Sequence, residues 1–338
     1  MKRLFAISGI AGMTGNELVH QILEDKTNEN KIIGFDNFYA SSIDTVKSYL
    51  DDERFDFFEY DLNNKVNMLS FEKKVNDSKK LFDEIIYINC AAVVHTEHFY
   101  HVYETFETNV EGMNSFMEQA IRVGAKKFIN CSTSEVYSMN SWNEEGGVKE
   151  DSFLTLANAE HSQRTSYAVG KLLTEFFMKD AVVSKKILGC SIRFANVYSK
   201  DEKYPKHIIP FIIDSLKNNG KVVLLENSKK NKRTFLNNYD SCSAVLALAM
   251  TDSALDGSVY NVATDEEISI IDLVHLCAAK MGINNPIIEF EGYRESDPER
   301  RLLSTKKIKS RTNWMPKIDL ECGLDLCIKN YLNLNNKE

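Results

Sequence analysis

The run Gly9-Ile-Ala-Gly12-Met-Thr-Gly15 is the most informative motif of this chain. It follows a β-rich segment, Leu4 to Ser8, and opens a helical pattern from Asn16 to Leu23. Glycines in this place allow a tight turn and let a pyrophosphate approach the backbone N–H groups at the helix N-terminus. Alone, a Gly-x-x-Gly-x-x-Gly string is a weak signal, because glycines also build ordinary turns. Its position between a strand and a helix makes it a candidate dinucleotide-binding motif.

An acidic residue stands where a dinucleotide site needs one. Asp36 ends the second β-rich segment, 21 positions after Gly15. A carboxylate there accepts hydrogen bonds from the ribose 2′-hydroxyl of adenosine and repels a 2′-phosphate, so it favours NAD over NADP. The alternative is a glycine turn beside a surface aspartate. The residues predicted to bind NAD at this end of the chain are Gly9, Gly12, Met13, Thr14, Gly15, Asp36 and Asn37.

Two further strand ends add to the expected cofactor site. Asp61 and Leu62 follow the third β-rich segment and are expected to flank the adenine. Ala91 and Ala92 follow the fourth, where small side chains let a cofactor pass close. Ligands of open α/β sheets bind beyond the carboxyl ends of the strands, so these residues are expected near the glycine turn.

Around these motifs, short β-rich segments alternate with helical patterns, which predicts an α/β fold with a Rossmann-type doubly wound parallel sheet. After Asn196 the pattern breaks into shorter pieces. We therefore expect an NAD-binding Rossmann domain with the catalytic residues over 1–195 and a smaller α/β lobe, mainly for the substrate, over 196–338. The expected strands of the first domain are Leu4 to Ser8, Lys31 to Phe35, Phe55 to Tyr60, Glu84 to Asn89, Lys127 to Cys131 and Leu188 to Phe194.

Composition excludes several classes of protein. The chain has 338 residues, 43% of them hydrophobic and 27% charged, which is typical of soluble globular proteins of one large or two medium domains. A formal net charge of -8 argues against a general binder of nucleic acid or anionic membranes. No segment approaches the ~20 apolar residues of a membrane span, and the N-terminus runs straight into the glycine motif instead of a cleavable signal. A cytoplasmic location is expected.

The seven cysteines are an odd number and contain no Cys-x-x-Cys. Because most of them lie inside apolar runs, we expect buried, reduced thiols. No metal site is predicted.

A second motif carries acid–base chemistry. Tyr167 and Lys171 are four residues apart in a helical pattern, hence on one helix face. Tyrosine has a reference pKa of about 10 and is a poor base at neutral pH, but a neighbouring ammonium group stabilises the phenolate. Alone, such a pair is usually found on a surface. Here it follows a dinucleotide motif and a polar cluster, Ser132-Thr-Ser-Glu-Val-Tyr137, at the end of the fifth predicted strand.

Taken together, these motifs resemble the extended short-chain dehydrogenase/reductase family, in its nucleotide-sugar branch, and are most like NAD-dependent nucleotide-sugar 4,6-dehydratases. The resemblance covers nearly the whole chain. Its motifs are Gly9 to Gly15, Asp36-Asn-Phe38, Asn109-Val-Glu-Gly112, Ser132 to Tyr137, Tyr167 to Lys171, Arg193-Phe-Ala-Asn196-Val-Tyr198, Gly257 to Val262, and Arg301 before Asn313-Trp-Met-Pro316.

The resemblance implies roles for particular residues. Thr133, Tyr167 and Lys171 would form the catalytic triad, and Asn109 would join the cofactor site. A nucleotide-diphosphate sugar would be the substrate, and a homodimer would form through the helices over 102–123 and 166–182. The residues that would bind the substrate are Ser134, His95, Asn196, Arg233 and Arg301.

Glu135 bears on the expected reaction. In this branch Tyr167 would take the proton of the sugar 4-hydroxyl while NAD oxidises C4. Glu135, two positions after Thr133, would then remove the C5 proton so that the C6 hydroxyl leaves as water. Return of the hydride to C6 would give a 4-keto-6-deoxy sugar, which is a 4,6-dehydratase reaction. The same Ser-Glu pair also resembles UDP-glucuronate decarboxylases, and a 4-epimerase is a further alternative. From another class, a non-catalytic NAD-binding sensor would be expected to have lost the triad, which is present here.

Two departures from the family leave the sugar and the nucleotide base open. Ser138 and Ser199 replace glycines that usually follow the two Val-Tyr motifs, and the usual Gly-Asp-Gly is absent before Arg233. The segment over 139–165 is long for the family and is expected to roof the sugar.

Overall fold

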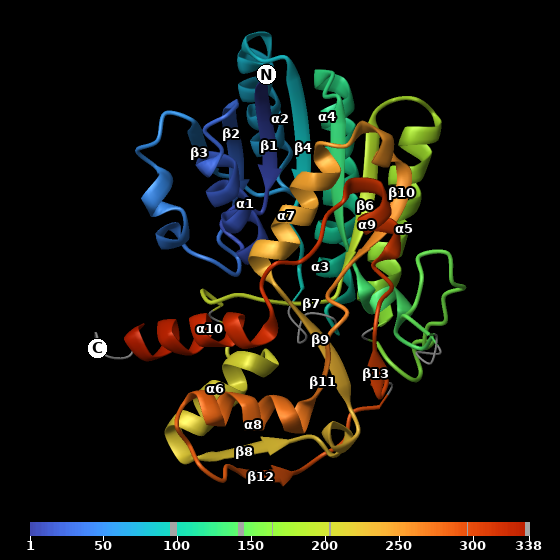
Figure 1. Ribbon diagram of the computed structural model, residues 1–338. Coiled ribbons are helices and arrows are strands. Elements are labelled where there is room, and N and C mark those ends of the chain that lie inside the picture. The colour runs from blue at the N-terminus through green and yellow to red at the C-terminus, as the bar shows by residue number, and fades with distance from the viewer. Residues whose placement is uncertain (95–99, 141–144, 164, 203, 296, 335–338) are drawn as a thin grey trace.

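The computed structural model describes residues 1–94, 100–140, 145–163, 165–202, 204–295 and 297–334. Its main feature is a seven-stranded sheet in the order β10-β6-β5-β4-β1-β2-β3, with every neighbouring pair parallel (Figure 1). The predicted Rossmann-type sheet is therefore confirmed. Its strands are β1 (Lys2–Ser8), β2 (Glu29–Asp36), β3 (Phe55–Glu59), β4 (Glu84–Asn89), β5 (Lys127–Thr133), β6 (Leu188–Phe194) and β10 (Asp256–Val262).

Helices cover both faces of this sheet, which is why its strands read as nearly continuous apolar runs. Side chains alternate along β1: Phe5 and Ile7 join one core, and Leu4 and Ala6 join the other. The first core is closed by α1 (Met13–Glu24) and α7 (Asn238–Ala249). The second is closed by α2 (Lys65–Ser78), α4 (Met113–Val123) and α5 (Thr165–Val183).

The helix expected over 102–123 has three parts. It begins as α3 (Val102–Phe106), passes through a π-helical stretch (Glu107–Gly112) and continues as α4. Such π-helical insertions are often found at functional sites. Here the stretch carries Asn109, which is fully buried.

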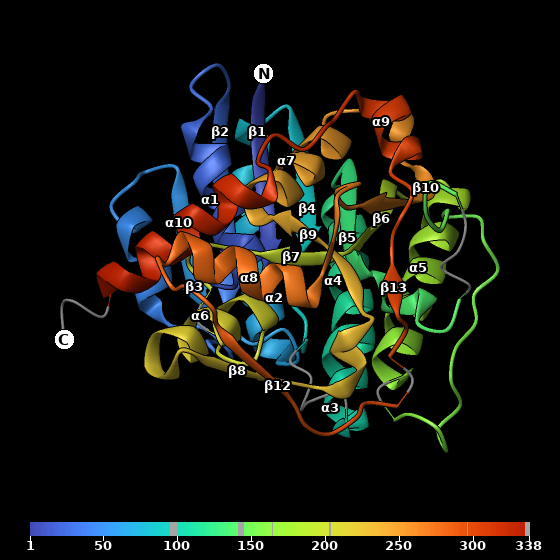
Figure 2. The ribbon, with the colours of Figure 1, turned by 60° about the horizontal axis from the view of Figure 1, so that its bottom comes forward.

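A smaller lobe lies at the edge of the main sheet where the strands end (Figures 1 and 2). One of its sheets has the order β11-β9-β13, with β7 also paired to β9, and the other pairs β12 with β8. A separate hydrophobic core holds these sheets and the helices α6, α8 and α10 together. The elements are β7 (Asn196–Tyr198), α6 (Ile208–Asn219), β8 (Lys221–Leu224), β9 (Lys232–Asn237), β11 (Glu267–Ser269), α8 (Ile270–Lys280), β12 (Ile287–Phe290), β13 (Arg300–Arg301) and α10 (Leu320–Leu334).

Two elements of the expected second lobe belong to the first domain. Strand β10 pairs with β6 as the edge of the main sheet, and α7 packs on α1, where the Asn238 side chain donates to the Met13 carbonyl at 2.8 Å. The short helix α9 (Lys306–Thr312) follows them, with Ile308 buried in the same core. The chain thus leaves the sheet after β6 and returns to it, so the boundary after 195 is crossed again by later residues.

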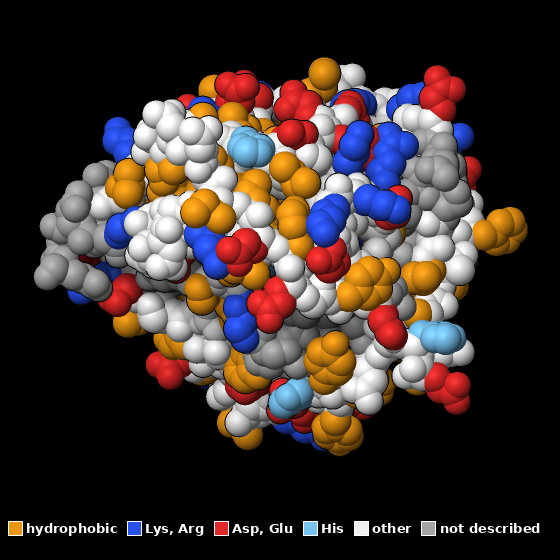
Figure 3. Space-filling model, turned by 90° about the horizontal axis from the view of Figure 1, so that it is seen from below, with side chains coloured by type: hydrophobic (Ala, Val, Ile, Leu, Met, Phe, Trp, Pro, Cys, Tyr) orange, Lys and Arg blue, Asp and Glu red, His pale blue; other side chains and the backbone are white. Residues whose placement is uncertain are grey.

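The surface carries charges of both signs, in agreement with the formal net charge of -8. On the face shown in Figure 3, Lys and Arg alternate with Asp and Glu, and hydrophobic side chains lie singly or in small groups. Among the described residues, no helix combines the length and apolar character needed to cross a membrane. All seven cysteines are free thiols. The expectation of burial is wrong for Cys322, which is exposed because α10 turns Leu324 and Ile328 inward and presents the opposite side to solvent.

Candidate functional site

The glycine turn is pressed against the end of β4. Gly9 has a φ of +67°, and a Cβ added to it would lie 2.6 Å from the backbone nitrogen of Ala91. A Cβ on Gly15 would overlap the carbonyl oxygen of Gly9. A side chain at either position would therefore force the backbone apart. The two glycines therefore let the turn pack directly against the end of β4 and against the start of α1.

Helix α1 begins at this turn with an uncapped first turn. Its N-cap residue is Gly12, and no side chain caps it. The first N–H groups of a helix need acceptors from outside the helix, and the helix dipole favours a negative charge there. The backbone of Met13 and Thr14 thus provides the donors that a phosphate group requires.

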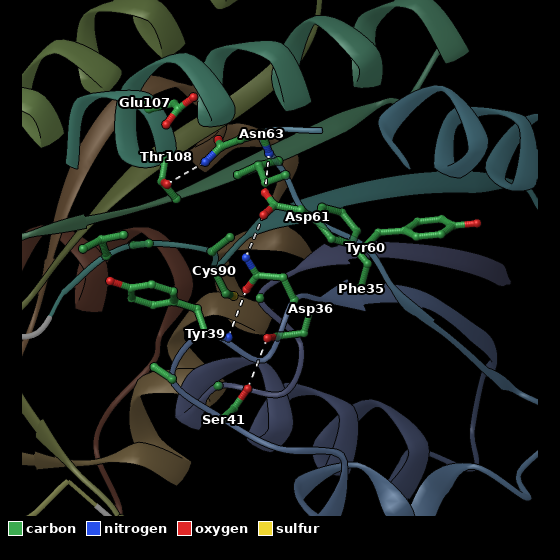
Figure 4. A pocket seen from close by; sticks show the side chains of 18 of the residues that line it. Phe35, Asp36, Tyr39, Ser41, Tyr60, Asp61, Asn63, Cys90, Glu107 and Thr108 are labelled. Atoms are coloured by element: carbon green, nitrogen blue, oxygen red, sulfur yellow. Dashed lines mark hydrogen bonds between the residues drawn. The ribbon is translucent and has the colours of Figure 1, made fainter. Parts of the chain in front are cut away.

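Asp36 is held at the end of β2 by backbone and hydroxyl donors. One carboxylate oxygen accepts from the Ala11 N–H at 3.0 Å, and the other accepts from the Phe38 N–H at 2.8 Å and the Ser41 hydroxyl at 3.1 Å (Figure 4). A carboxylate has about four acceptor positions, so these bonds orient it and leave acceptor capacity for a ribose hydroxyl.

A cavity of about 260 Å³ lies in front of these groups (Figure 4). Beside Asp36, the Asn37 side chain donates to Asp61 at 3.1 Å, and Asn63 donates to Thr108 at 2.9 Å. Tyr39, Asn63 and Thr108 are lining residues that no sequence motif indicated. The cavity brings together eight of the residues predicted to bind the cofactor: Gly9, Gly12, Asp36, Asn37, Asp61, Leu62, Ala91 and Ala92.

Asn109 contributes to this cavity indirectly. Its side chain accepts from the Val93 N–H at 2.7 Å and donates to the Val93 carbonyl at 3.0 Å. Val93 lines the cavity, whereas Asn109 is buried behind it. Within the described residues, Asn109 therefore fixes the wall that follows Ala91 and Ala92.

Tyr167 and Lys171 lie in the first turns of α5, and both are buried. The ammonium group of Lys171 donates to the Cys131 carbonyl on β5 at 2.9 Å. Burial lowers the pKa of Lys171 to about 8. The nearby Cys131 and Cys90 thiols and Glu175 raise this pKa, but by less than burial lowers it. The two thiols lie 4.0 Å apart, and Cys90 lines the cofactor cavity. Lys171 is thus connected to the wall of that cavity through the ends of β4 and β5.

The polar cluster after β5 forms a short turn. Thr133 ends the strand, and its hydroxyl accepts from the Glu135 N–H at 3.2 Å. Ser134 and Glu135 are half-buried in the 3₁₀ turn that follows. The threonine hydroxyl therefore fixes the direction in which Glu135 leaves the sheet.

A buried ion pair between Arg193 and Glu175 stabilises this turn. The Arg193 guanidinium donates to both carboxylate oxygens of Glu175, at 2.9 and 2.6 Å, and to the Tyr137 hydroxyl at 2.5 Å. Ser132 donates to the same carboxylate at 2.6 Å. These bonds join α5, β6 and both ends of the polar cluster, so they hold α5 and the turn that carries Glu135 in one frame.

Glu135 faces a second and larger cavity, of about 610 Å³, between the main sheet and the smaller lobe. Asn196, Arg233 and Arg301, all predicted to bind substrate, line it as well. Arg301 pairs with Glu135 at 2.5 Å. The Asn196 amide donates to the Thr234 carbonyl at 3.1 Å, which ties β7 to β9 beside Arg233. The structure thus brings residues from 135 to 301 to one site.

Sequence reasoning missed Asp297 in this cavity. Its carboxylate accepts from Arg233 at 3.0 Å and from Asn231 at 2.8 Å. It lies in an irregular segment before β13, where no periodicity or motif marked it. The only available signal was an acidic residue four positions before a predicted anion-binding arginine. Of the other predicted residues, His95 lies outside the described residues.

The chain is similar to known enzymes along most of its length. The family model described as GDP-mannose 4,6 dehydratase matches residues 6–326. The dTDP-D-glucose 4,6-dehydratase of Dictyostelium discoideum is 30% identical over 271 residues, which are 79% of this chain and 59% of that protein. UDP-glucuronic acid decarboxylase 5 of Arabidopsis thaliana is 26% identical, over 96% of this chain and 88% of that protein.

Among solved structures, the fold is similar to that of DesIV, a dTDP-glucose 4,6-dehydratase from Streptomyces venezuelae solved with NAD and TYD bound. The TM-score is 0.84 at 20% identity, covering 100% of this chain and 98% of that one. At this identity the likeness concerns the fold. The expected family is confirmed by the family model, while dehydratases and decarboxylases both occur among the relatives.

Proposed function

We propose that this chain, which belongs to the GDP-mannose 4,6 dehydratase family, is an NAD-dependent nucleotide-sugar 4,6-dehydratase. The observation that carries the proposal is the position of Glu135. Its carboxylate lines the same cavity as Arg233 and Arg301, and it follows Thr133 at the end of β5, in a turn that contacts the helix that carries Tyr167. A base at this place, with cations for a diphosphate beside it, suits removal of a proton from a bound sugar.

NAD is the cofactor that the first cavity supports. The tight glycine turn packed on the end of β4, the uncapped start of α1 and the oriented carboxylate of Asp36 match a pyrophosphate and a ribose. The NAD-bound structure of DesIV shares this fold. When bound, NAD would supply the hydride chemistry: it would take a hydride from C4 and, after loss of water, return it to C6 as C5 regains a proton, so that no NADH accumulates.

The chain's own residues carry the proton transfers. Tyr167 takes the proton of the sugar 4-hydroxyl, and the buried charge of Lys171 stabilises the resulting phenolate. A ketone at C4 makes the C5 hydrogen acidic, and Glu135 removes it. The C6 hydroxyl then leaves with a proton as water. The triad of Thr133, Tyr167 and Lys171 is complete, which supports an enzyme over a non-catalytic NAD-binding sensor.

A second candidate is decarboxylation of a nucleotide hexuronate. The pairing of Arg301 with Glu135 favours it, because a guanidinium beside the sugar also suits a carboxylate on C5. The decarboxylase relative aligns over nearly all of this chain. In this reaction the same oxidation at C4 weakens the bond from C5 to its carboxylate, which leaves as carbon dioxide.

The mass of the product decides between the two. The purified protein is incubated with a panel of nucleotide hexoses and hexuronates, and each product is weighed by mass spectrometry. We expect loss of one water from a hexose, without net formation of NADH, and no such loss with Glu135→Gln. Loss of carbon dioxide from a hexuronate would replace the proposal with a decarboxylase, and conversion without change of mass would replace it with an epimerase.

We also propose that the chain forms a homodimer through α5 and α3. Val169, Leu173 and Phe176 are exposed on α5 at a spacing that places them on one face, and Phe176 is 65% exposed. Helix α3, which packs on α5, exposes Tyr103 and Phe106. A patch of this kind favours a second copy of the same face. Phe176→Glu is expected to yield monomers in light scattering, whereas a dimer unchanged by this substitution would contradict the assignment of the interface.

A further inference from the structure

Four charged side chains form a chain of contacts along the wall of the second cavity. Glu135 pairs with Arg301 at 2.5 Å, and the second amino group of Arg301 lies 3.6 Å from Asp297. Asp297 in turn pairs with Arg233 at 3.0 Å. Each of the four side chains is 16% exposed or less. The predicted base and the predicted diphosphate-binding arginines are therefore parts of one buried network.

The charges of this network cancel in the absence of a ligand. Two guanidinium groups face two carboxylates, and a buried charge without such a partner would be costly. Burial, together with the neighbouring Arg301, lowers the pKa of Arg233 to about 10, so this arginine is still cationic at neutral pH. A diphosphate that enters this site has to compete with the two carboxylates for the arginines.

The two arginines differ in how firmly they are held. Arg233 donates to the backbone carbonyls of Lys232 and Glu299, at 2.8 and 3.2 Å, in addition to Asp297. The ion pairs of Arg301, in contrast, go to carboxylates, and its Nε is buried without a hydrogen-bond acceptor within the described part of the chain. A buried donor without an acceptor is an unfavourable state that a ligand oxygen would relieve. Arg301 is thus the arginine suited to change partners.

We propose that Arg301 exchanges Glu135 for the substrate's diphosphate, so that diphosphate binding releases the base, and that Asp297 is the positioning residue that sets this exchange. This inference rests on the nucleotide-sugar site of the proposed function, but it holds for either the dehydration or the decarboxylation. Asp297 is itself tethered by Asn231 and Arg233. It offers Arg301 a second carboxylate, which makes departure from Glu135 easier.

Two consequences distinguish this exchange from a purely structural role. Because both carboxylates compete with the diphosphate, removing either negative charge tightens the binding of a nucleoside diphosphate. In Asp297→Asn the tighter binding of the diphosphate also slows release of the nucleotide product, so kcat falls together with KM. If the substitutions only disrupted the site, the affinity for the nucleoside diphosphate would fall instead of rising.

Binding is measured by titration calorimetry of UDP, GDP and dTDP into the NAD-loaded protein. For the nucleotide that binds best, Glu135→Gln and Asp297→Asn are each expected to lower Kd by about tenfold, as for coupling between charges in contact. Glu289→Gln removes a charge from an exposed ion pair of β12 outside the cavity lining and is the matched control, with Kd unchanged. Unchanged or weaker binding by Glu135→Gln would overturn the exchange, even if Asp297→Asn fails to fold.

Kinetics on the converted nucleotide sugar complete the test. Asp297→Asn is expected to lower KM and kcat together, whereas a higher KM with unchanged kcat would overturn the role of Asp297. The calorimetric binding measurements do not depend on whether the enzyme catalyses dehydration or decarboxylation. A wild-type product that has lost carbon dioxide would contradict the proposed dehydratase and leave the exchange intact. A dehydrated product together with unaltered nucleotide affinity in Glu135→Gln would contradict the exchange alone.

Discussion

The two cavities of this protein are built by different means. The cofactor cavity is formed by backbone: a compressed glycine turn, an uncapped helix start and strand ends that lie next to each other in one sheet. The second cavity is lined by apolar side chains and by long charged ones, whose charges are paired between the turn after β5, β9, β13 and the segment before β13. The backbone geometry of the first cavity follows from short sequence motifs, whereas the buried ion pairs of the second cavity form only when distant parts of the chain have packed together. Substitutions should therefore separate the two cavities cleanly.

The largest expected effect comes from Tyr167, the proposed base, which lines neither cavity. Tyr167→Phe removes the hydroxyl that accepts the substrate proton, and kcat should fall by about 10³-fold, the usual contribution of a general base. Affinities for NAD and for the nucleoside diphosphate should stay within a factor of two or so, because neither cavity loses a lining group. Turnover at the normal rate would show that another residue is the base.

A substitution at Gly9 should affect the cofactor cavity alone. Gly9→Ala places a Cβ at a positive φ and against Ala91, so NAD affinity is expected to fall by about 100-fold. Calorimetric titration of NAD measures this loss, and the affinity for nucleoside diphosphate should not change.

Gly124→Ala is the matched control for Gly9. Gly124 ends α4 with a φ of +77° and has no atom within 4 Å of an added Cβ. It carries the same backbone cost of about 1 kcal/mol without the collision. An equal loss of NAD affinity in both variants would mean that general destabilisation, rather than the collision between residue 9 and Ala91, explains the result.

The reverse separation is expected at Arg233. Lysine keeps the charge but loses the planar fork that bonds the Lys232 and Glu299 carbonyls and Asp297. Arg233→Lys should raise KM for the nucleotide sugar by about tenfold and leave NAD affinity unchanged. Arg300→Lys, on the neighbouring residue of β13 but paired with Glu267 outside the cavity lining, serves as control. A similar rise in KM in both variants would contradict a specific role of Arg233 in binding the nucleotide sugar.

The smallest effect is a pH dependence of Lys171. Its pKa of about 8 in the folded protein, lowered chiefly by burial, lies below the ordinary lysine value of 10.5. As pH rises above 8, the charge that supports Tyr167 is lost, and kcat should fall toward tenfold per pH unit. The unfolded chain holds the proton longer, so the contribution of Lys171 to the free energy of unfolding should rise between these two pKa values.

Activity and stability should therefore move in opposite directions on the alkaline side. Steady-state kinetics and urea titrations across alkaline pH measure both, with Lys171→Met as the reference that lacks this titration. A parallel fall of kcat and of the Lys171 contribution to stability would show that unfolding, and not loss of the Lys171 charge, limits the activity.

Much of the first domain was predictable because its signals are local. The glycine turn, Asp36 and the apolar strands specify six of the seven strands of the sheet, and the motifs at the strand ends indicate eight of the 19 residues that line the cofactor cavity. The segment Val259 to Val262 also indicated a strand, but not its sheet. It pairs with β6 only because the chain returns there after the smaller lobe.

The sequence by itself determined the family, the parallel sheet, the cofactor motif and the helix face that carries Tyr167 and Lys171, since each depends on residues a few positions apart. Tertiary structure alone decided that Asn109 supports Val93 from behind and that Asp297 lies between Arg233 and Arg301. It also decided that Glu135 meets Arg301, which is 166 residues away in the chain. Such contacts arise from the packing of the lobe against the ends of the strands, and neither periodicity nor spacing contains that information.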